Sequence, residues 1–279
     1  MSRQLTPCQI AERSIIKKYR KSIWNPFIAA VSRYELINEG DRIAVCISGG
    51  KDSMLMAKLV SQLQRISKVP FEVVYLVMDP GYNEKNLDKI KKNAELLEVP
   101  VTIFNTDIFS VADSVTESPC YLCARMRRGH LYAKAKELGC NKIALGHHLN
   151  DVIETTLMGM MYGSQLQAML PKLKSTNFEG MELIRPMFCI REDDIIAWAR
   201  YNSLEFIACA CKFTENDKKA QTEELSKRRE IKELIRHASK LNPDVEHNML
   251  KSLENVHLDT FIEYKTEGKR HSFLERFKK

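Results

Sequence analysis

The segment AVCISGGKDSMLMAKLV, residues 44–60, contains the transition that decides the fold. An apolar run stops at Ser48, the pair Gly49 and Gly50 follows, and a helix-like pattern begins near Ser53. A short buried strand that passes through glycine into a helix is typical of α/β proteins. We therefore predict a strand before this turn and a helix after it.

Strand-like and helix-like segments alternate on both sides of this turn. The predicted strands are 42–47, 71–78, 101–106, 142–148 and 183–187, and the predicted helices are 53–65, 84–98, 122–138 and 150–162. This alternation favours a parallel sheet, because parallel strands need a crossover connection that is usually a helix. The predicted fold class is α/β, with a doubly wound, mostly parallel sheet and helical extensions.

The two ends of the chain differ from this central part. Residues 1–40 carry helical patterns, and residues 216–279 are strongly charged, with an amphipathic helix pattern over 218–241. The sequence contains no internal repeat and no low-complexity linker. We predict an N-terminal helical segment over 1–40, an α/β domain over 41–215 and a charged helical C-terminal extension over 216–279.

Composition limits the functional classes. The chain has 279 residues, 43 Lys and Arg against 36 Asp and Glu, and a net charge of +7, which is compatible with an anionic partner such as RNA. No apolar run approaches the roughly 20 residues that cross a membrane. The first residues, MSRQLTPCQIAERSIIKKYRK, lack the apolar core of a secretory signal. We expect a cytoplasmic protein without a membrane partner.

The predicted turn is suited to binding an anion. Ligands gather at the carboxyl ends of parallel strands, where the following helices present unpaired N–H groups. Gly49 and Gly50 allow close approach of the backbone, while Lys51 offers a cation and Ser53 a hydroxyl. Asp52 would repel a phosphate unless Mg²⁺ bridges them. The alternative is a tight turn in which Ser53 only caps the helix.

The cysteines point to further chemistry. The chain has eight, and in a cytoplasmic protein this favours metal or reactive-thiol roles over disulfides. Four of them form two close pairs, Cys120 with Cys123 and Cys209 with Cys211. A C-x-x-C spacing lets two thiolates face one metal. Three alternatives are a structural Zn²⁺ in a Cys₄ site, a metal-free redox or persulfide-carrying pair, and thiols without a role.

Four longer segments resemble a known family. EGDRIAVCISGGKDS, CYLCARMRRGHLY, KIALGHHLNDVIETTLMGMMYG and IRPM followed by REDDI occur in this order over roughly residues 39–210. Together they resemble the tRNA 2-thiocytidine synthetase family of PP-loop, or N-type ATP pyrophosphatase, proteins. The resemblance implies a PP-loop fold and an ATP-dependent sulfurtransferase. Such an enzyme adenylates the C2 carbonyl of a tRNA cytidine, replaces its oxygen with sulfur, and releases AMP and pyrophosphate.

The resemblance also implies a nucleotide site, in which the turn cradles the ATP phosphates and the second strand ends beside the adenosine. The implied ATP-binding residues are Ser48, Gly49, Gly50, Lys51, Asp52, Ser53, Met78, Gly146 and His147. Asp151 could coordinate Mg²⁺ together with Asp52, with Glu154 as a weaker candidate. Asn150 or Asp151 could instead cap the helix. Asn150 stands where the family commonly has an acidic residue.

The family joins a C-x-x-C pair to one distant cysteine to hold a [4Fe-4S] cluster, which carries sulfide to the activated base. The resemblance therefore implies Cys120, Cys123 and Cys209 as the cluster ligands. Cys211 would be a spare thiol or a fourth ligand. The catalytic residues predicted in this way are Asp52, Asp151, Cys120, Cys123 and Cys209.

A basic segment follows the C-x-x-C pair. Arg125, Arg127 and Arg128 suit the phosphate backbone of an RNA, or form a solvated helix face. The expected partners are tRNA and a sulfur donor such as a cysteine desulfurase or free sulfide, and a homodimer stays open. The alternatives to tRNA thiolation are a paralogue that thiolates or amidates another acceptor, as lysidine synthetases do with an amine, and a non-catalytic sensor of nucleotide and iron–sulfur cluster.

Overall fold

The computed structural model describes residues 4–109, 119–207 and 223–277. Its centre is a six-stranded sheet in the order β3-β2-β1-β4-β6-β5. The strands are β1 (Arg42–Ile47), β2 (Glu72–Asp79), β3 (Val101–Asn105), β4 (Lys142–Ala144), β5 (Lys172–Lys174) and β6 (Glu182–Ile184). All neighbouring pairs are parallel except β5 with β6. The predicted doubly wound, mostly parallel sheet is confirmed.

The order of the strands creates a switch point beside β1. The chain passes from β1 to β2 and β3 on one side, then returns to place β4 on the other side. Ile43 of β1 pairs with Lys142 of β4, and Val45 pairs with Ala144. The carboxyl ends of β1 and β4 therefore lie side by side where the strand order reverses, which is the place where ligands bind in such sheets.

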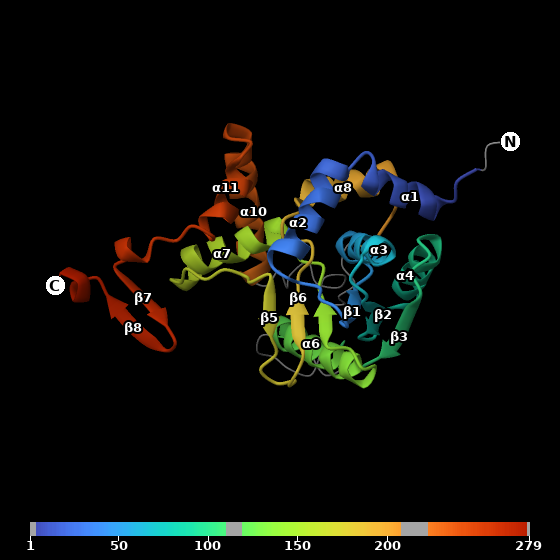
Figure 1. Cartoon of the computed structure of the whole chain (residues 1–279), viewed down its shortest axis with the longest axis horizontal. Helices are drawn as coiled ribbons and strands as arrows, with labels where there is room; N and C mark the ends of the chain where they lie inside the picture. The colour runs from blue at the N-terminus through green and yellow to red at the C-terminus, as the bar shows by residue number, and fades with distance from the viewer. Residues whose placement is uncertain (1–3, 110–118, 208–222, 278–279) are drawn as a thin grey trace.

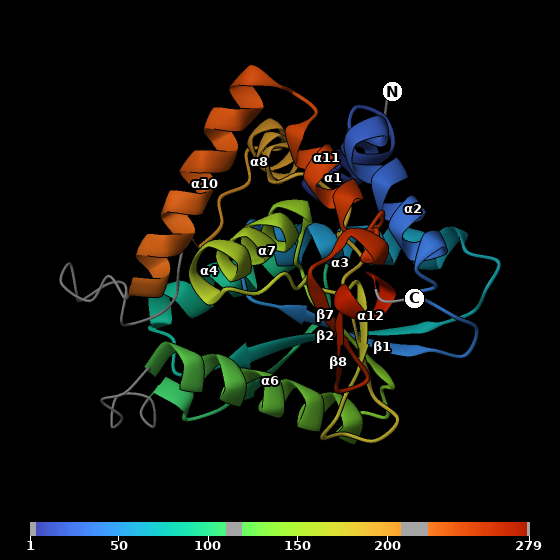
Figure 2. The same ribbon diagram turned by 90° about the vertical axis from the view of Figure 1, so that its left-hand side faces the viewer.

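Helices cover both faces of the sheet (Figure 2). The helix α6 (Pro119–Glu137) lies on one face, and α3 (Lys51–Ile66) and α4 (Glu84–Leu96) lie on the other. Side chains of a strand alternate between the two faces. Accordingly Ile43, Val45 and Ile47 pack in the large core with α3, whereas Ala44 and Cys46 pack in the core with α6. Burial on both faces explains the continuous apolar run of β1.

The N-terminal segment packs on the α3 side of the sheet (Figure 1). It contains α1 (Pro7–Ile16), a π-helical turn (Arg20–Trp24) and α2 (Asn25–Arg33), and it contributes to the core that contains α8 (Glu192–Tyr201). The buried Nζ of Lys58 in α3 lies 2.7 Å from Oε1 of Glu12 and donates to the carbonyl oxygen of Leu97. This pairing satisfies the buried ammonium and fixes α1 against α3.

The C-terminal segment is only partly helical. The helices α10 (Glu223–Leu241) and α11 (Val245–Ser252) pack on α7 (Leu149–Gly163) through Ile231, Ile235 and Leu250. A 3₁₀ turn (Leu258–Thr260), an antiparallel hairpin of β7 (Glu263–Thr266) and β8 (Lys269–Ser272), and the short α12 (Leu274–Phe277) follow. The expectation of a helical extension is therefore incomplete, and the division into three parts stays a proposal.

No helix in the three described ranges is long and apolar enough to cross a membrane.

Candidate functional site

The connection from β1 to α3 forms a compact loop at the switch point. The Ser53 hydroxyl donates to the carbonyl oxygen of Gly50 at 3.0 Å and accepts from the amide of Ser48 at 3.1 Å. Gly49 has a φ of +84°, and a Cβ there would lie 2.5 Å from Cγ1 of Ile90, so only glycine fits. No side chain in the described part of the protein caps α3, so its first N–H groups have no side-chain acceptor there.

The connection from β4 to α7 lies directly beside this loop. A Cβ on Gly146 would lie 3.2 Å from the amide nitrogen of Ser53. His148 and Asp151 cap α7 reciprocally: Asp151 donates its amide to Nδ1 of His148 at 3.4 Å, and its Oδ2 accepts from the amide of His148 at 3.0 Å. Two helix N-termini therefore meet at one place, which is favourable for a negatively charged ligand.

A cavity of about 400 Å³ lies between the two loops. Seven of the predicted site residues line it, namely Ser48, Asp52, Ser53, Met78, Gly146, His147 and Asp151. The helix α6 adds Arg127 and Arg128 to the wall. Gly49, Gly50 and Lys51 are not among its lining residues in the described part of the chain. The structure thus brings together residues from three strand ends and α6, while the chemical roles of these residues stay predictions.

Lys51 points toward carboxylates. Its Nζ lies 3.1 Å from Oδ1 of Asp52 and 3.1 Å from Oε1 of Glu192 in α8. Burial alone would lower the pKa of Lys51, but the two carboxylates outweigh it and raise the pKa. Oδ1 of Asp52 is buried and makes no hydrogen bond of good geometry within the described residues. A contact between Lys51 and phosphate, expected from the sequence, stays a prediction.

The helix α10 brings two cations to the same region. Nη1 of Arg228 lies 3.6 Å from Oδ1 of Asp151 and 3.8 Å from Oε2 of Glu154. Nζ of Lys232 lies 2.9 Å from Oε2 of Glu192 and 3.8 Å from Oε1 of Glu154. Arg228, Lys232 and Glu192 are not among the site residues predicted from the sequence. Their signals are the place of Glu192 in the REDDI segment and the four-residue spacing of Arg228 and Lys232 within the amphipathic pattern over 218–241.

The two acidic partners of Lys232 have opposite pKa shifts. Glu154 is 1% exposed, and burial raises its pKa to about 7 despite the nearby cations. For Glu192, burial also acts to raise the pKa, but the hydrogen bond from Lys232 and the charges of Lys51 and Lys232 lower it to about 2. Burial therefore moves the pKa of Glu154 toward neutrality, whereas its cationic partners keep Glu192 ionised at neutral pH.

His147 presents a neutral imidazole to the cavity. Burial is the main reason that its pKa falls to about 4. Its Nδ1 is buried and has no hydrogen-bond partner among the residues that the structure describes. A neutral ring of this kind can exchange hydrogen bonds with a polar ligand without adding charge.

The amide of Asn150 joins three helices. Its Nδ2 donates to Oε1 of Glu246 in α11 at 3.1 Å, and its Oδ1 accepts from the amide of Glu192 at the start of α8 at 2.8 Å. Asn150 is buried and is not among the described residues that line the cavity. An aspartate here would lose the donor to Glu246, so the asparagine is explained by its structural partners.

The arginines of α6 fall into two groups. Arg127 and Arg128 line the cavity, and Arg127 donates to the hydroxyl of Tyr82 at 3.0 Å. Arg125 is exposed. Contact of these three side chains with RNA stays a prediction.

The structure leaves the cysteine prediction untested. Cys209 and Cys211 lie outside the described residues. Cys120 and Cys123 stand three positions apart at the start of α6, and their side chains also lie outside the described part. Among the described residues, no group of three or more His, Cys, Asp or Glu could hold a metal ion. The described cysteines Cys8, Cys46, Cys140 and Cys189 are free thiols.

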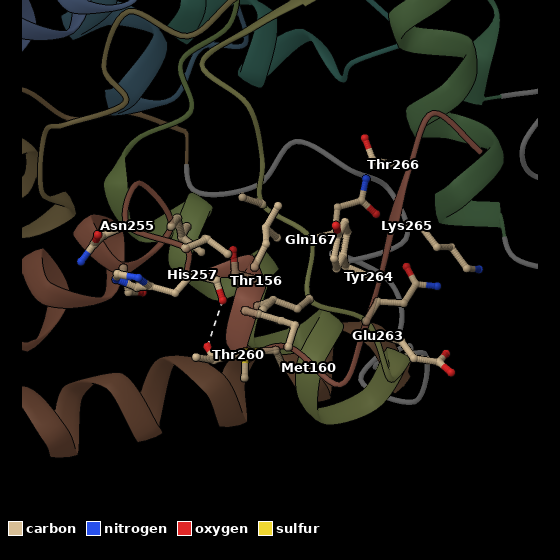
Figure 3. Close-up of a pocket in the computed structure, with 18 of the residues that line it drawn as sticks. Thr156, Met160, Gln167, Asn255, His257, Thr260, Glu263, Tyr264, Lys265 and Thr266 are labelled. Carbon is tan, nitrogen blue, oxygen red and sulfur yellow. Dashed lines mark hydrogen bonds between the residues drawn. The ribbon is translucent and has the colours of Figure 1, made fainter. Parts of the chain in front are cut away.

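A second, larger cavity of about 1300 Å³ lies elsewhere, between the end of α7, the segment after α11 and the β7–β8 hairpin. Figure 3 shows Thr156 and Met160 of α7 beside His257 and Thr260 of the segment after α11, with Tyr264 of β7 on the other side. None of the candidate site residues lines this cavity. Its size therefore does not make it the site of the predicted chemistry.

Comparison with known proteins gives consistent relationships. Residues 16–218 match the PP-loop domain family. The chain is 37% identical to the tRNA-cytidine(32) 2-sulfurtransferase of Geobacter metallireducens, over 86% of this chain and 91% of the relative. It is 36% identical to the enzyme of the same name from Vibrio parahaemolyticus, over 86% and 77% of the two chains.

A solved structure has a similar fold. It is the U34-tRNA thiolase NcsA from Methanococcus maripaludis with its [4Fe-4S] cluster, at a TM-score of 0.66 and 21% identity. The similarity covers 88% of this chain and 79% of the thiolase. At this level of identity, the likeness concerns the fold.

Proposed function

The chain belongs to the PP-loop family, among the tRNA-cytidine(32) 2-sulfurtransferases, and from this premise we propose that it is an ATP-dependent tRNA-cytidine sulfurtransferase. The proposed reaction transfers AMP to the C2 oxygen of a tRNA cytidine and releases pyrophosphate. Sulfide sulfur then bonds to C2 while the C2–O bond breaks, and the oxygen leaves on the phosphate of AMP. The observation that carries the proposal is the cavity between the β1 and β4 loops, which is lined by serines, two aspartates and a neutral histidine.

The phosphates of ATP have clear candidate donors in this cavity. The first N–H groups of α3 lack a side-chain cap, and the hydroxyls of Ser48 and Ser53 lie 3.2 Å apart beside them. These groups bind and orient the phosphates in the proposal. Met78, at the end of β2, is buried at the wall of the cavity and packs against the adenosine.

Two carboxylates fit a magnesium ion. Oδ1 of Asp52 is buried without a hydrogen bond of good geometry among the described residues, and Asp151 lines the same cavity. Carboxylate oxygens are the protein ligands that Mg²⁺ prefers, usually alongside substrate phosphates. When bound, Mg²⁺ offsets the repulsion between these carboxylates and the triphosphate. The chain's own contribution is to hold Asp52 and Asp151 in place through Lys51 and the His148 cap.

The sulfur chemistry rests on the cysteines. Cys120 and Cys123 are one helical turn apart at the start of α6, the helix that also brings Arg127 and Arg128 to the cavity. We assign these two and Cys209 as the ligands of a [4Fe-4S] cluster, with Cys211 as a spare or fourth ligand. Thiolates are the usual ligands of such clusters. When bound, the cluster supplies a site for sulfide, and zinc or a metal-free thiol pair is the alternative.

The arginines of α6 have a role in binding RNA. The side chains of Arg127 and Arg128 at the cavity wall orient the phosphates that flank the target cytidine, and the exposed Arg125 extends this basic surface. The imidazole of His147, neutral at pH 7, contacts the nucleotide without attracting a second phosphate. The sulfur donor is a cysteine desulfurase or free sulfide. In this proposal the reaction takes place in the cytoplasm. The protein acts there as a monomer or as a homodimer.

Anaerobic turnover with defined components tests this function. The protein is incubated with ATP, Mg²⁺, sulfide and unmodified tRNA, and AMP, pyrophosphate and thionucleosides are measured. We expect tRNA-dependent formation of AMP in proportion to 2-thiocytidine. Asp52→Asn should lose both products, while Asp88→Asn, at an exposed position of α4, should keep them. AMP formation that depends on an amine acceptor, or an absence of turnover with bound nucleotide, would contradict the proposal.

A further inference from the structure

One face of α10 meets the acidic side of the phosphate site, and the function proposed above leaves it without a role. Arg228 and Lys232 are one turn apart on this helix. Arg228 lies against Asp151, which lines the cavity, and Lys232 lies against Glu192. Arg228 therefore contacts the first turn of α7, the helix that follows β4, and Lys232 contacts the first turn of α8.

The contacts form one series of charges. Glu192 accepts from Lys51 and from Lys232 on its two oxygens, so it links α10 to the phosphate loop. Glu154 lies between Lys232 and Arg228, at 3.8 Å from each. The charged series runs from Asp52 through Lys51, Glu192, Lys232, Glu154 and Arg228 to Asp151. The imidazole of His148 lies between Asp151 and Asp52.

Charge balance shows what α10 contributes. Without its two cations, the cluster would contain four carboxyl groups, those of Asp52, Asp151, Glu154 and Glu192, against the single ammonium of Lys51. These carboxyl groups oppose binding of a triphosphate, because partly buried charges are poorly screened, and Arg127 and Arg128 on the cavity wall offset them only from the side of α6. Arg228 and Lys232 bring the cations to three. An anion can then bind with the help of one divalent ion.

The exposure of the two cations suits ligand binding. The side chains of Arg228 and Lys232 are 39% and 32% exposed, whereas that of Glu154 is 2% exposed. The buried carboxyl thus fixes one side of each cation, and the remaining N–H groups stay accessible. A guanidinium held in this way can donate two parallel hydrogen bonds to a phosphate.

We propose that Arg228 and Lys232 bind the terminal phosphates of ATP, and then the pyrophosphate that is released on adenylation of the base. This inference rests on the proposed function, since it needs ATP in the cavity between the β1 and β4 loops. The contact of Arg228 with Asp151 holds the guanidinium ready at the loop. Asp52 and Asp151 would hold the Mg²⁺ that accompanies ATP, and Arg228 and Lys232 would donate their exposed N–H groups to the β- and γ-phosphates.

Calorimetric titration with three probes tests the inference. Mg·ATP, pyrophosphate with Mg²⁺, and AMP are each titrated into the anaerobically purified full chain. Arg228→Ala and Lys232→Ala should each weaken binding of ATP and pyrophosphate by at least about tenfold and leave AMP binding unchanged, because AMP lacks the terminal phosphates. Arg228→Lys should recover part of the loss. Arg229→Ala, which removes an equal charge from an exposed position of α10, should bind all three probes like the wild type.

Two results would overturn the inference. One is an unchanged affinity for ATP and pyrophosphate in both alanine variants. The other is an equal loss of AMP affinity, which would mean that α10 supports the shape of the cavity instead of binding phosphate. Failure of the proposed function is a separate result, in which the wild-type chain binds neither ATP nor AMP.

Discussion

Gly146 lies against the first turn of α3, where a Cβ added to it would be 3.2 Å from the amide nitrogen of Ser53 and 3.3 Å from the carbonyl carbon of Asp52. Both neighbours are backbone atoms, so they cannot rotate away as a side chain could. The close approach places the N-termini of α3 and α7 side by side, at the wall of the same cavity.

Gly146→Ala should therefore weaken ATP binding by roughly tenfold, because the methyl group pushes the two loops apart by a few tenths of an ångström. Calorimetry with Mg·ATP measures the change. Gly163→Ala is the matched control, since nothing lies within 4 Å of a Cβ at that position. Equal affinities of Gly146→Ala and wild type would show that the loops can separate without cost.

Asn150→Asp should destabilise the fold by about 1–3 kcal/mol and give no gain in activity, because it places a second carboxylate against Glu246 and removes a donor. Urea denaturation measures the free energy of unfolding. Adding Glu246→Gln should restore part of the lost stability, because it removes the facing carboxylate but also weakens the ion pair of Glu246 with Arg191. The coupling appears in the double-mutant cycle of the two changes. Additive effects of the two substitutions would refute the assigned contact.

Glu154 should make stability depend on pH. Its folded-state pKa is about 7 against an ordinary value of 4.5, mainly because of burial. The folded chain holds this proton more tightly than the unfolded chain, so the stabilisation is full below about pH 4.5 and is lost as the pH rises through 7. Between pH 4.5 and a pH well above 7, the free energy of unfolding of the wild type should fall by about 3 kcal/mol more than that of Glu154→Gln. Denaturation in EDTA at several pH values measures it.

Glu233→Gln, at an exposed position of α10, is the control for that series and should run parallel to the wild type. Parallel stability profiles for Glu154→Gln and wild type would mean that folding does not raise the pKa of Glu154, and would contradict the prediction.

The sequence was informative where the signal is local. The apolar run of residues 42–47 predicted β1, and the glycine pair predicted the turn that follows it. The strands predicted over 142–148 and 183–187 end earlier, at Ala144 and Ile184, because pairing with the neighbouring strands stops there and the chain turns into loops. Apolar residues continue past those points into the core, so hydrophobicity alone overestimated both strands.

Some elements, among them β5 and the β7–β8 hairpin, escaped prediction for a different reason. The edge strand β5 is short, two of its three residues are lysines, and only its pairing with β6, such as Leu173 with Leu183, makes it a strand. The β7–β8 hairpin is formed by charged residues around Glu267 and Gly268, both with positive φ. Charge-rich segments were interpreted as helical, although a Glu-Gly pair between alternating residues is compatible with a tight hairpin turn.

Within the site, the sequence identified the residues next to the strand ends but not their partners. The cavity contains the predicted serines and aspartates because parallel strands end at one edge. Lys51 was assigned to phosphate, yet its ammonium lies against Glu192, which is 141 residues away. Arg228 was overlooked for the same reason: which face of α10 meets α7 is decided by packing of Ile231 and Ile235.

Iron analysis tests the assignment of the cysteines. Anaerobically purified protein should contain about four iron atoms and four acid-labile sulfides per chain, as expected for one [4Fe-4S] cluster. Cys120→Ala and Cys123→Ala should lose both, because each removes one thiolate ligand. Cys140→Ala, in the core beside α6, should retain them. One zinc ion per chain and no iron would contradict the cluster and would show that the cysteines hold a structural zinc ion.

The most direct test of the central claim is mass spectrometry of tRNA nucleosides from cells with and without the gene. Deletion should abolish 2-thiocytidine. The wild-type gene should restore it, whereas genes that encode Asp52→Asn or Cys120→Ala should not, because one lacks the proposed magnesium ligand and the other a sulfur-site thiolate. An unchanged thionucleoside profile after deletion would contradict the claim that this chain thiolates tRNA.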